Sequence, residues 1–191
     1  ASDVYKRQVY ALVAAIDAKD SFTFQHSTNV SQYAVLLAQK LGLPGDDIQT
    51  VKVAGLLHDI GKIGIPESIL KKAGKLTNEE YEIMKSHVEK SIEMIHYLPN
   101  MNYVIPAVVS HHERYDGKGY PRGIKGEEIP FLGRILAVCD SFDAMISKRA
   151  YKEPLSVEYA RGELEKNKGT QFDPEVADAF IELIKEGKVP L

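Results

Sequence analysis

LLHDIGKIGIP, residues 56–66, joins the end of a helical pattern to a histidine-aspartate pair. Apolar residues recur at helical spacing between residues 48 and 57, so His58 and Asp59 are predicted to lie in the last turn of a helix. Gly61 follows and is predicted to take the left-handed conformation that often ends a helix. A helix C-terminus exposes carbonyl oxygens, which makes it a favourable place for a cation. The stretch therefore predicts a helix that ends in a cation-binding pair.

Helical patterns extend in both directions from this stretch. The predicted helices cover residues 30–41, 48–59, 77–95, 103–112 and 129–147, with two more near the C-terminus. Thr77 and Glu80 form a capping-box pattern that opens a helix containing His87. Asp173 and Pro174 suit the N-cap and the first position of the last helix. We find no internal repeat and no alternation typical of strands, so the predicted fold class is all-α without a substantial sheet.

Composition limits the classes of function. The chain has 191 residues and a formal net charge of -3, which indicates one globular domain without a basic face for duplex nucleic acid. Cys139 is the only cysteine, which excludes an internal disulfide and favours a reducing, cytoplasmic compartment. No apolar stretch approaches the roughly 20 residues that span a bilayer. Residues 1–8, ASDVYKRQ, resemble translated adapter or linker sequence, so we expect one domain over residues 9–191 and a regulatory domain upstream.

Five of the six histidines lie in settings typical of metal ligands: His26, His58, His87, His111 and His112. Imidazole and carboxylate ligands together suit iron, manganese or zinc, and a carboxylate can bridge two ions. Asp59 is the natural bridge. Asp140 lies in an apolar helical pattern, where an unpaired buried carboxylate is costly and a metal ion would offset that cost. The remaining histidine, His96, has no motif partner and is predicted to be structural.

Four strings occur in a fixed order: HDIGKIGIP from residue 58, KLTNEEYEIMKSH from 75, HHERYDGKGYP from 111 and CDSFDAMISKRAY from 139. Together they resemble the HD-GYP group of the HD-domain metal-dependent phosphohydrolases, whose members hydrolyse cyclic di-GMP. The resemblance covers about residues 17–176. It implies an HD-domain bundle of about seven to eight helices with a polar GYP loop, residues 115–126. It also implies a cytoplasmic cyclic di-GMP phosphodiesterase.

The resemblance further implies a metal centre built from two ligand sets. One ion would be held by His26, His58, Asp59 and Asp140, and the second by His87, His111, His112 and the bridging Asp59. Iron or manganese is expected, with zinc as an alternative. Some members carry a glutamate four residues before the first histidine and hold a third ion, but that position is Phe22 here. The resemblance therefore favours two ions and linear pGpG as the main product, with slower or no conversion to GMP.

Substrate contacts are implied in the same way. Lys62 would meet the scissile phosphate, stabilise the transition state and protonate the leaving group. Arg149 and Lys152 would grip the other phosphate, and Tyr120 would line the guanine side. Asp143, one turn after Asp140, would orient a metal ligand or a base.

Several alternatives stay open. Ser91 stands where the group commonly has glycine, which we predict affects helix packing rather than chemistry. The substrate could be another cyclic dinucleotide or a nucleotide, because the sequence does not separate guanine from adenine. A non-catalytic module that binds cyclic di-GMP or a protein is the third reading. The GYP loop could also dock a GGDEF-type partner, and the chain could form a homodimer.

Overall fold

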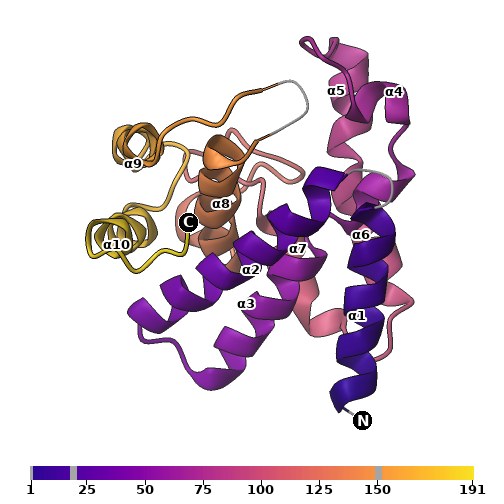
Figure 1. The fold of residues 1–191 in the computed structure, drawn as a ribbon, viewed down its shortest axis with the longest axis horizontal. Coiled ribbons are helices and arrows are strands. Elements are labelled where there is room, and N and C mark those ends of the chain that lie inside the picture. The colour runs from indigo at the N-terminus through magenta and orange to yellow at the C-terminus, as the bar shows by residue number, and fades with distance from the viewer. Residues whose placement is uncertain (1, 18–20, 149–151) are drawn as a thin grey trace.

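The computed structural model describes residues 2–17, 21–148 and 152–191 and is built from helices (Figure 1). The α-helices are α1 (Ser2–Asp17), α2 (Ser21–Lys40), α3 (Gly45–Leu57), α4 (Glu67–Leu70), α5 (Asn78–Lys85), α6 (His87–His96), α7 (Ile105–Ser110), α8 (Phe131–Ile146), α9 (Val157–Lys166) and α10 (Pro174–Lys185). Three short 3-10 helices join them: η1 (Ile60–Gly64), η2 (Asn102–Val104) and η3 (Gly126–Glu128). The described residues form no strand, and Lys168 and Phe172 form an isolated bridge, so the all-α prediction is confirmed.

The centre of the bundle is the α2–α3 hairpin and the buried helix α8 (Figure 1). Gly42 ends α2 with a φ of 72°, as the predicted helix end requires, and lets the chain turn back into α3. α2 packs on α8, and α7 packs on both α3 and α8. Leu37, Leu57 and Phe142 are fully buried between these helices. Each such side chain stabilises the fold by roughly 1.5–3 kcal/mol.

The long helix predicted from Thr77 to Ile95 is divided in the structure. The capping box of Thr77 and Glu80 opens α5 as predicted, but Ser86 has a ψ of -11° and separates α5 from α6. The Ser86 hydroxyl donates to the Ile83 carbonyl at 2.6 Å, which satisfies an acceptor at the end of α5. His87 is therefore the first residue of α6 and not an interior residue. This break is one reason why the described helices outnumber the seven to eight expected.

Gly61 does not take the predicted left-handed conformation, because it lies inside η1. Gly61 instead allows the backbone of η1 to approach the backbone of α6 closely. A Cβ atom there would lie 2.0 Å from the His87 carbonyl oxygen and 2.4 Å from the Ser91 nitrogen. Glycine is needed at this position because η1 packs directly against the first turns of α6.

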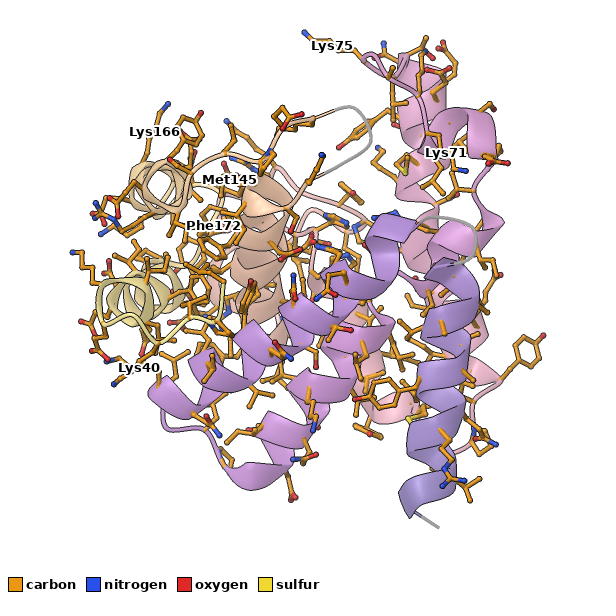
Figure 2. All side chains as sticks on the ribbon, viewed as in Figure 1. Lys40, Lys71, Lys75, Met145, Lys166 and Phe172 are labelled. Atoms are coloured by element: carbon orange, nitrogen blue, oxygen red, sulfur yellow. The ribbon has the colours of Figure 1, made fainter. Side chains whose placement is uncertain are left out.

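The C-terminal helices cover α8 on one side. Asp173 caps α10 by accepting hydrogen bonds from the Glu175 and Val176 amides, as predicted. Asp173 also pairs with Arg134 of α8 at 2.6 Å, and this contact holds α10 against the core. At the far end Lys40 of α2 lies beside α10 (Figure 2). Its Nζ pairs with Glu182 of α10 at 3.0 Å.

The segment that contains α4 and α5 projects from the bundle at the opposite end from α9 and α10 (Figure 1). Lys71 and Lys75 lie on this projection (Figure 2). Among the described helices, none combines the length and the apolar character needed to cross a membrane.

Candidate metal centre

Seven predicted side chains converge where α2, the α3–η1 junction, α6, α7 and α8 meet. They form two groups: His26, His58, Asp59 and Asp140, and Asp59, His87, His111 and His112. In each group one donor atom from every residue lies within 4.8 Å of all the others. The helices therefore place both predicted ligand sets together, and Asp59 belongs to both.

The two oxygens of Asp59 face different groups. Oδ2 lies 3.4 Å from His58 Nε2 and 3.8 Å from His26 Nε2. Oδ1 lies 3.3 Å from His87 Nε2 and 4.0 Å from His111 Nε2. Asp59 follows the end of α3, so the backbone fixes its carboxylate between the two sets of imidazoles. This is the geometry of a carboxylate that bridges two cations.

Three of the imidazoles are oriented by backbone carbonyl groups. His58, His87 and His111 each place Nδ1 against the carbonyl oxygen three residues earlier, at 2.6, 2.7 and 2.5 Å. A carbonyl only accepts hydrogen bonds, so Nδ1 carries a proton, and in the neutral imidazole Nε2 then has the lone pair. All three Nε2 atoms are buried and have no hydrogen-bond partner among the described residues. Buried lone pairs that face carboxylates are the arrangement that a metal ion needs. Without an ion, three buried polar atoms would lack a partner, which is costly.

His26 is held differently, by two carboxylates of α8. Its Nε2 lies 2.8 Å from Asp140, and its Nδ1 lies 2.6 Å from Asp143. Asn29, one turn along α2, donates to the other Asp143 oxygen at 2.8 Å. Burial lowers the pKa of His26, but the hydrogen bonds to Asp140 and Asp143 outweigh burial and raise the pKa to about 9. Asp143 thus lies where it can orient His26. The sequence predicted that Asp143 orients a metal ligand or a base, and that role stays a prediction.

Burial and neighbouring charges set the protonation states of four other candidate ligands. Burial raises the pKa of Asp59, but the positive charge of Lys62 and the contact with His87 outweigh burial and hold it well below its usual value. Burial raises the pKa of Asp140 as well, and its hydrogen bond with His26 reverses that effect. Burial lowers the pKa of His111 well below its ordinary value and that of His112 to about 4. The carboxylates are therefore ionised and these two imidazoles neutral at pH 7.

His112 is positioned by stacking. Tyr120 of the GYP loop lies over its ring with centroids 4.7 Å apart and an interplanar angle of 19°. Tyr81 of α5 meets the Tyr120 ring edge-on at 6.3 Å. The GYP loop is thus tied to both the histidine cluster and the projecting segment.

A cavity of about 680 Å³ opens onto this cluster, within the size range of small-molecule sites. It is lined by His26, Asp59, His87, His112 and Asp140, by four lysines, Lys62, Lys71, Lys72 and Lys152, and by Tyr120, Met84 and Gln171 among others. Lys62 pairs with Asp59 Oδ2 at 2.7 Å. The predicted contact Arg149 lies outside the described residues. A second cavity of about 270 Å³ near Tyr10 and Tyr103 has no imidazole or carboxylate in its lining, so the first cavity is the candidate site.

Asn29 and Glu113 lie near the site and were not given a role from the sequence, and Ser91 was predicted only to affect helix packing. Asn29 lies three positions after His26, so helical spacing could have placed it beside Asp143. Glu113 is buried, and its Oε1 accepts a hydrogen bond from the Arg122 amide at 2.7 Å, which anchors the GYP loop. Ser91 makes contacts that depend on the packing of η1 on α6, for which the sequence carries no local signal.

Comparison with known proteins places this arrangement in a family. A family model described as the HD domain matches residues 11–176. The chain belongs to the HD-domain family. The predicted resemblance to its HD-GYP group is confirmed, and the histidine-aspartate pair is His58 and Asp59.

Curated relatives of this HD domain are longer proteins. A cyclic di-GMP phosphodiesterase of Thermotoga maritima is 44% identical over 170 residues, which is 88% of this chain and 46% of that protein. A 3'3'-cGAMP-specific phosphodiesterase 2 of Vibrio cholerae is 40% identical, over 93% of this chain and 34% of that protein. The chain thus spans less than half the length of these relatives.

A solved structure shares the fold. The crystal structure of the V. cholerae cyclic GMP-AMP-specific phosphodiesterase V-cGAP3 matches with a TM-score of 0.76 and 18% identity. The match covers 95% of this chain and 49% of that one.

Proposed function

We propose that this HD domain is a metal-dependent phosphodiesterase that hydrolyses cyclic di-GMP to linear pGpG. The observation that carries the proposal is the division of the cluster into two ligand groups that share the Asp59 carboxylate. The 44% identity to a cyclic di-GMP phosphodiesterase over most of the chain supports the choice of substrate. The cavity of about 680 Å³ supports a ligand of dinucleotide size.

The seven clustered side chains would hold two divalent ions, for which iron and manganese are our first candidates and zinc the alternative. When bound, such ions would supply Lewis acidity at a phosphate and a water acidic enough to act as nucleophile at neutral pH. The buried Nε2 lone pairs of His58, His87 and His111 provide neutral ligands, and the ionised Asp59 and Asp140 balance the added charge. Phe22 in place of a glutamate supports two ions rather than three.

The remaining residues would position the substrate. Lys62 lines the cavity beside Asp59, where its ammonium group can neutralise charge on the scissile phosphate and give a proton to the leaving sugar oxygen. We propose that Lys152 and Arg149 bind the second phosphate. Tyr120 would line one nucleobase, and Asp143 would hold His26 in the orientation that binds metal.

A second candidate substrate is 3'3'-cGAMP, because a relative 40% identical to this chain is named for that activity. The two cyclic dinucleotides have the same phosphodiester ring and differ in one base. Base contacts therefore decide between them, whereas the metal-centre chemistry is the same.

The deciding experiment is a substrate panel. The protein would be purified without oxygen, its metal content measured, and aliquots incubated with cyclic di-GMP, 3'3'-cGAMP or cyclic di-AMP before chromatography of the products. About two ions per chain, with pGpG formed fastest from cyclic di-GMP, is the expected result. Faster turnover of 3'3'-cGAMP would favour the second candidate, and metal binding without hydrolysis would refute an enzymatic role on these substrates.

Assembly is a separate proposal. We expect the GYP loop to be a docking surface for a GGDEF-type partner, and the domain to work with a regulatory segment and as a homodimer. Light scattering and pull-down of a purified GGDEF protein with and without Tyr120→Ala would test these expectations.

A further inference from the structure

Ser91 lies in the second turn of α6, and its side chain is fully buried. Its Oγ accepts a hydrogen bond from the Gly61 amide at 2.8 Å. The same oxygen lies 2.8 Å from the His87 carbonyl and 3.2 Å from the His58 carbonyl, and can donate its one proton to either. One hydroxyl therefore connects the backbone of two of the segments that supply candidate ligands, the His58–Asp59 segment and the start of α6.

We infer that Ser91 is a positioning residue for the metal centre, which sets the spacing between the His58–Asp59 segment and His87. The inference rests on the proposed metal site, and goes beyond it by assigning a role to a residue that supplies no ligand.

The geometry explains how a backbone contact can act on the ligands. His58 is held by the carbonyl of Gly55 in α3, and His87 by that of Met84 near the end of α5, so each imidazole moves with the backbone just before it. His58 belongs to one ligand group and His87 to the other. A shift of α6 relative to η1 would therefore move His87 away from Asp59, which both groups share, and would distort the group that His87 belongs to.

Packing alone does not account for the contact. At Gly61 the chain approaches α6 so closely that no side chain fits, and this approach brings the Gly61 amide onto the Ser91 hydroxyl. Without the hydroxyl, a buried N–H would lose its partner and the two segments would separate or admit water. Groups that orient metal ligands from outside commonly change metal affinity by 10- to 100-fold when removed. We expect the lower end, because Ser91 acts through backbone.

The test compares Ser91→Ala with Ser31→Ala in metal-stripped protein titrated with Mn²⁺ by calorimetry. Ser31 is the matched control because it is also buried and joins two helices through one hydroxyl, which donates to the Lys52 carbonyl at 2.7 Å. Ser91→Ala should bind Mn²⁺ about tenfold more weakly, whereas Ser31→Ala should keep the wild-type affinity. Both variants should melt at a lower temperature than wild type in the absence of metal.

Equal Mn²⁺ affinity in wild type and Ser91→Ala, with only the metal-free melting temperature lowered, would overturn the inference and leave Ser91 a packing residue. If Ser91→Ala does not fold, Ser91→Gly removes the same hydroxyl and leaves room for a water, and it is judged by the same affinity criterion. No nucleotide enters this experiment. A wild-type protein that binds Mn²⁺ but hydrolyses no cyclic dinucleotide would refute the proposed function and leave the Ser91 inference standing.

Discussion

Replacing Gly61 by alanine tests whether the contact between η1 and α6 holds the metal centre together. The added Cβ would lie 2.0 Å from the His87 carbonyl oxygen and 2.4 Å from the Ser91 nitrogen. Real Cβ atoms essentially never approach closer than 3.0 Å, so the carbonyl must move by about 1 Å. Both neighbours are backbone atoms of a helix and cannot swing aside as a flexible side chain would. The whole start of α6 must therefore move away from η1.

The size of the effect follows from two contributions. Overpacking of this kind typically destabilises by about 1–3 kcal/mol, and loss of the hydrogen bond from the Gly61 amide to Ser91 adds about 1 kcal/mol. The free energy of unfolding of metal-free protein should fall by about 2–4 kcal/mol. For a chain of this length the melting temperature should fall by roughly 5–15 °C. Because His87 opens α6, Mn²⁺ affinity should fall as well.

Gly162→Ala is the matched control. Gly162 lies in α9, and a Cβ there meets nothing within 4 Å. The same substitution at that position should raise stability by up to about 1 kcal/mol, since alanine favours a helix, and should leave metal binding unchanged. Thermal unfolding followed by circular dichroism, with Mn²⁺ calorimetry on the same samples, measures both quantities. Wild-type melting and wild-type Mn²⁺ affinity in Gly61→Ala would refute the steric argument.

Three further predictions concern the cluster and cavity. Asp59→Ala should remove the bound metal and abolish turnover while far-UV circular dichroism stays helical; retained activity would refute the bridging role. In metal-free protein the hydrogen bonds of His26 raise its pKa to about 9, so a metal ion that binds at pH 7 must displace a proton from His26. The apparent metal affinity should therefore rise about tenfold for each unit of pH, up to that pKa, from this group alone. Asp143→Asn removes a charge that raises this pKa, so calorimetry in two buffers should show fewer protons released; an unchanged count would contradict the assignment. Lys152→Ala should raise KM several-fold with little change in kcat, whereas the surface control Lys166→Ala should change neither, and a fall in kcat alone would argue against a binding role.

The sequence predicted the helices and the clustered side chains because both have local signals. Helical spacing and capping residues placed α2, α8 and α10, and the motif strings named the seven residues that converge. The pairing of His26 with Asp143 joins residues 117 positions apart, so only the motif's resemblance, and no local pattern, could suggest it.

The differences between prediction and structure arise from tertiary contacts. Ser86 carries no proline or glycine signal, yet its ψ ends one helix and starts the next. Gly61 was predicted to end a helix in the left-handed conformation because it is a glycine. In the structure it is needed because η1 packs so closely on α6 that a side chain would not fit. Ser91 was predicted to affect packing, and its hydrogen bonds to three backbone groups became apparent only from the fold.

The cluster draws on residues from His26 to Asp140, so most of the chain must be made before the ligand sets are complete. A growing polypeptide offers only the adjacent pairs His58–Asp59 and His111–His112 until α8 has emerged and folded onto α2. Because the unfolded chain binds metal ions only weakly, ions in solution bind almost entirely to the native state and stabilise it. The metal available to the growing cells should therefore determine how much of the protein folds and escapes degradation, as well as how much of it is active.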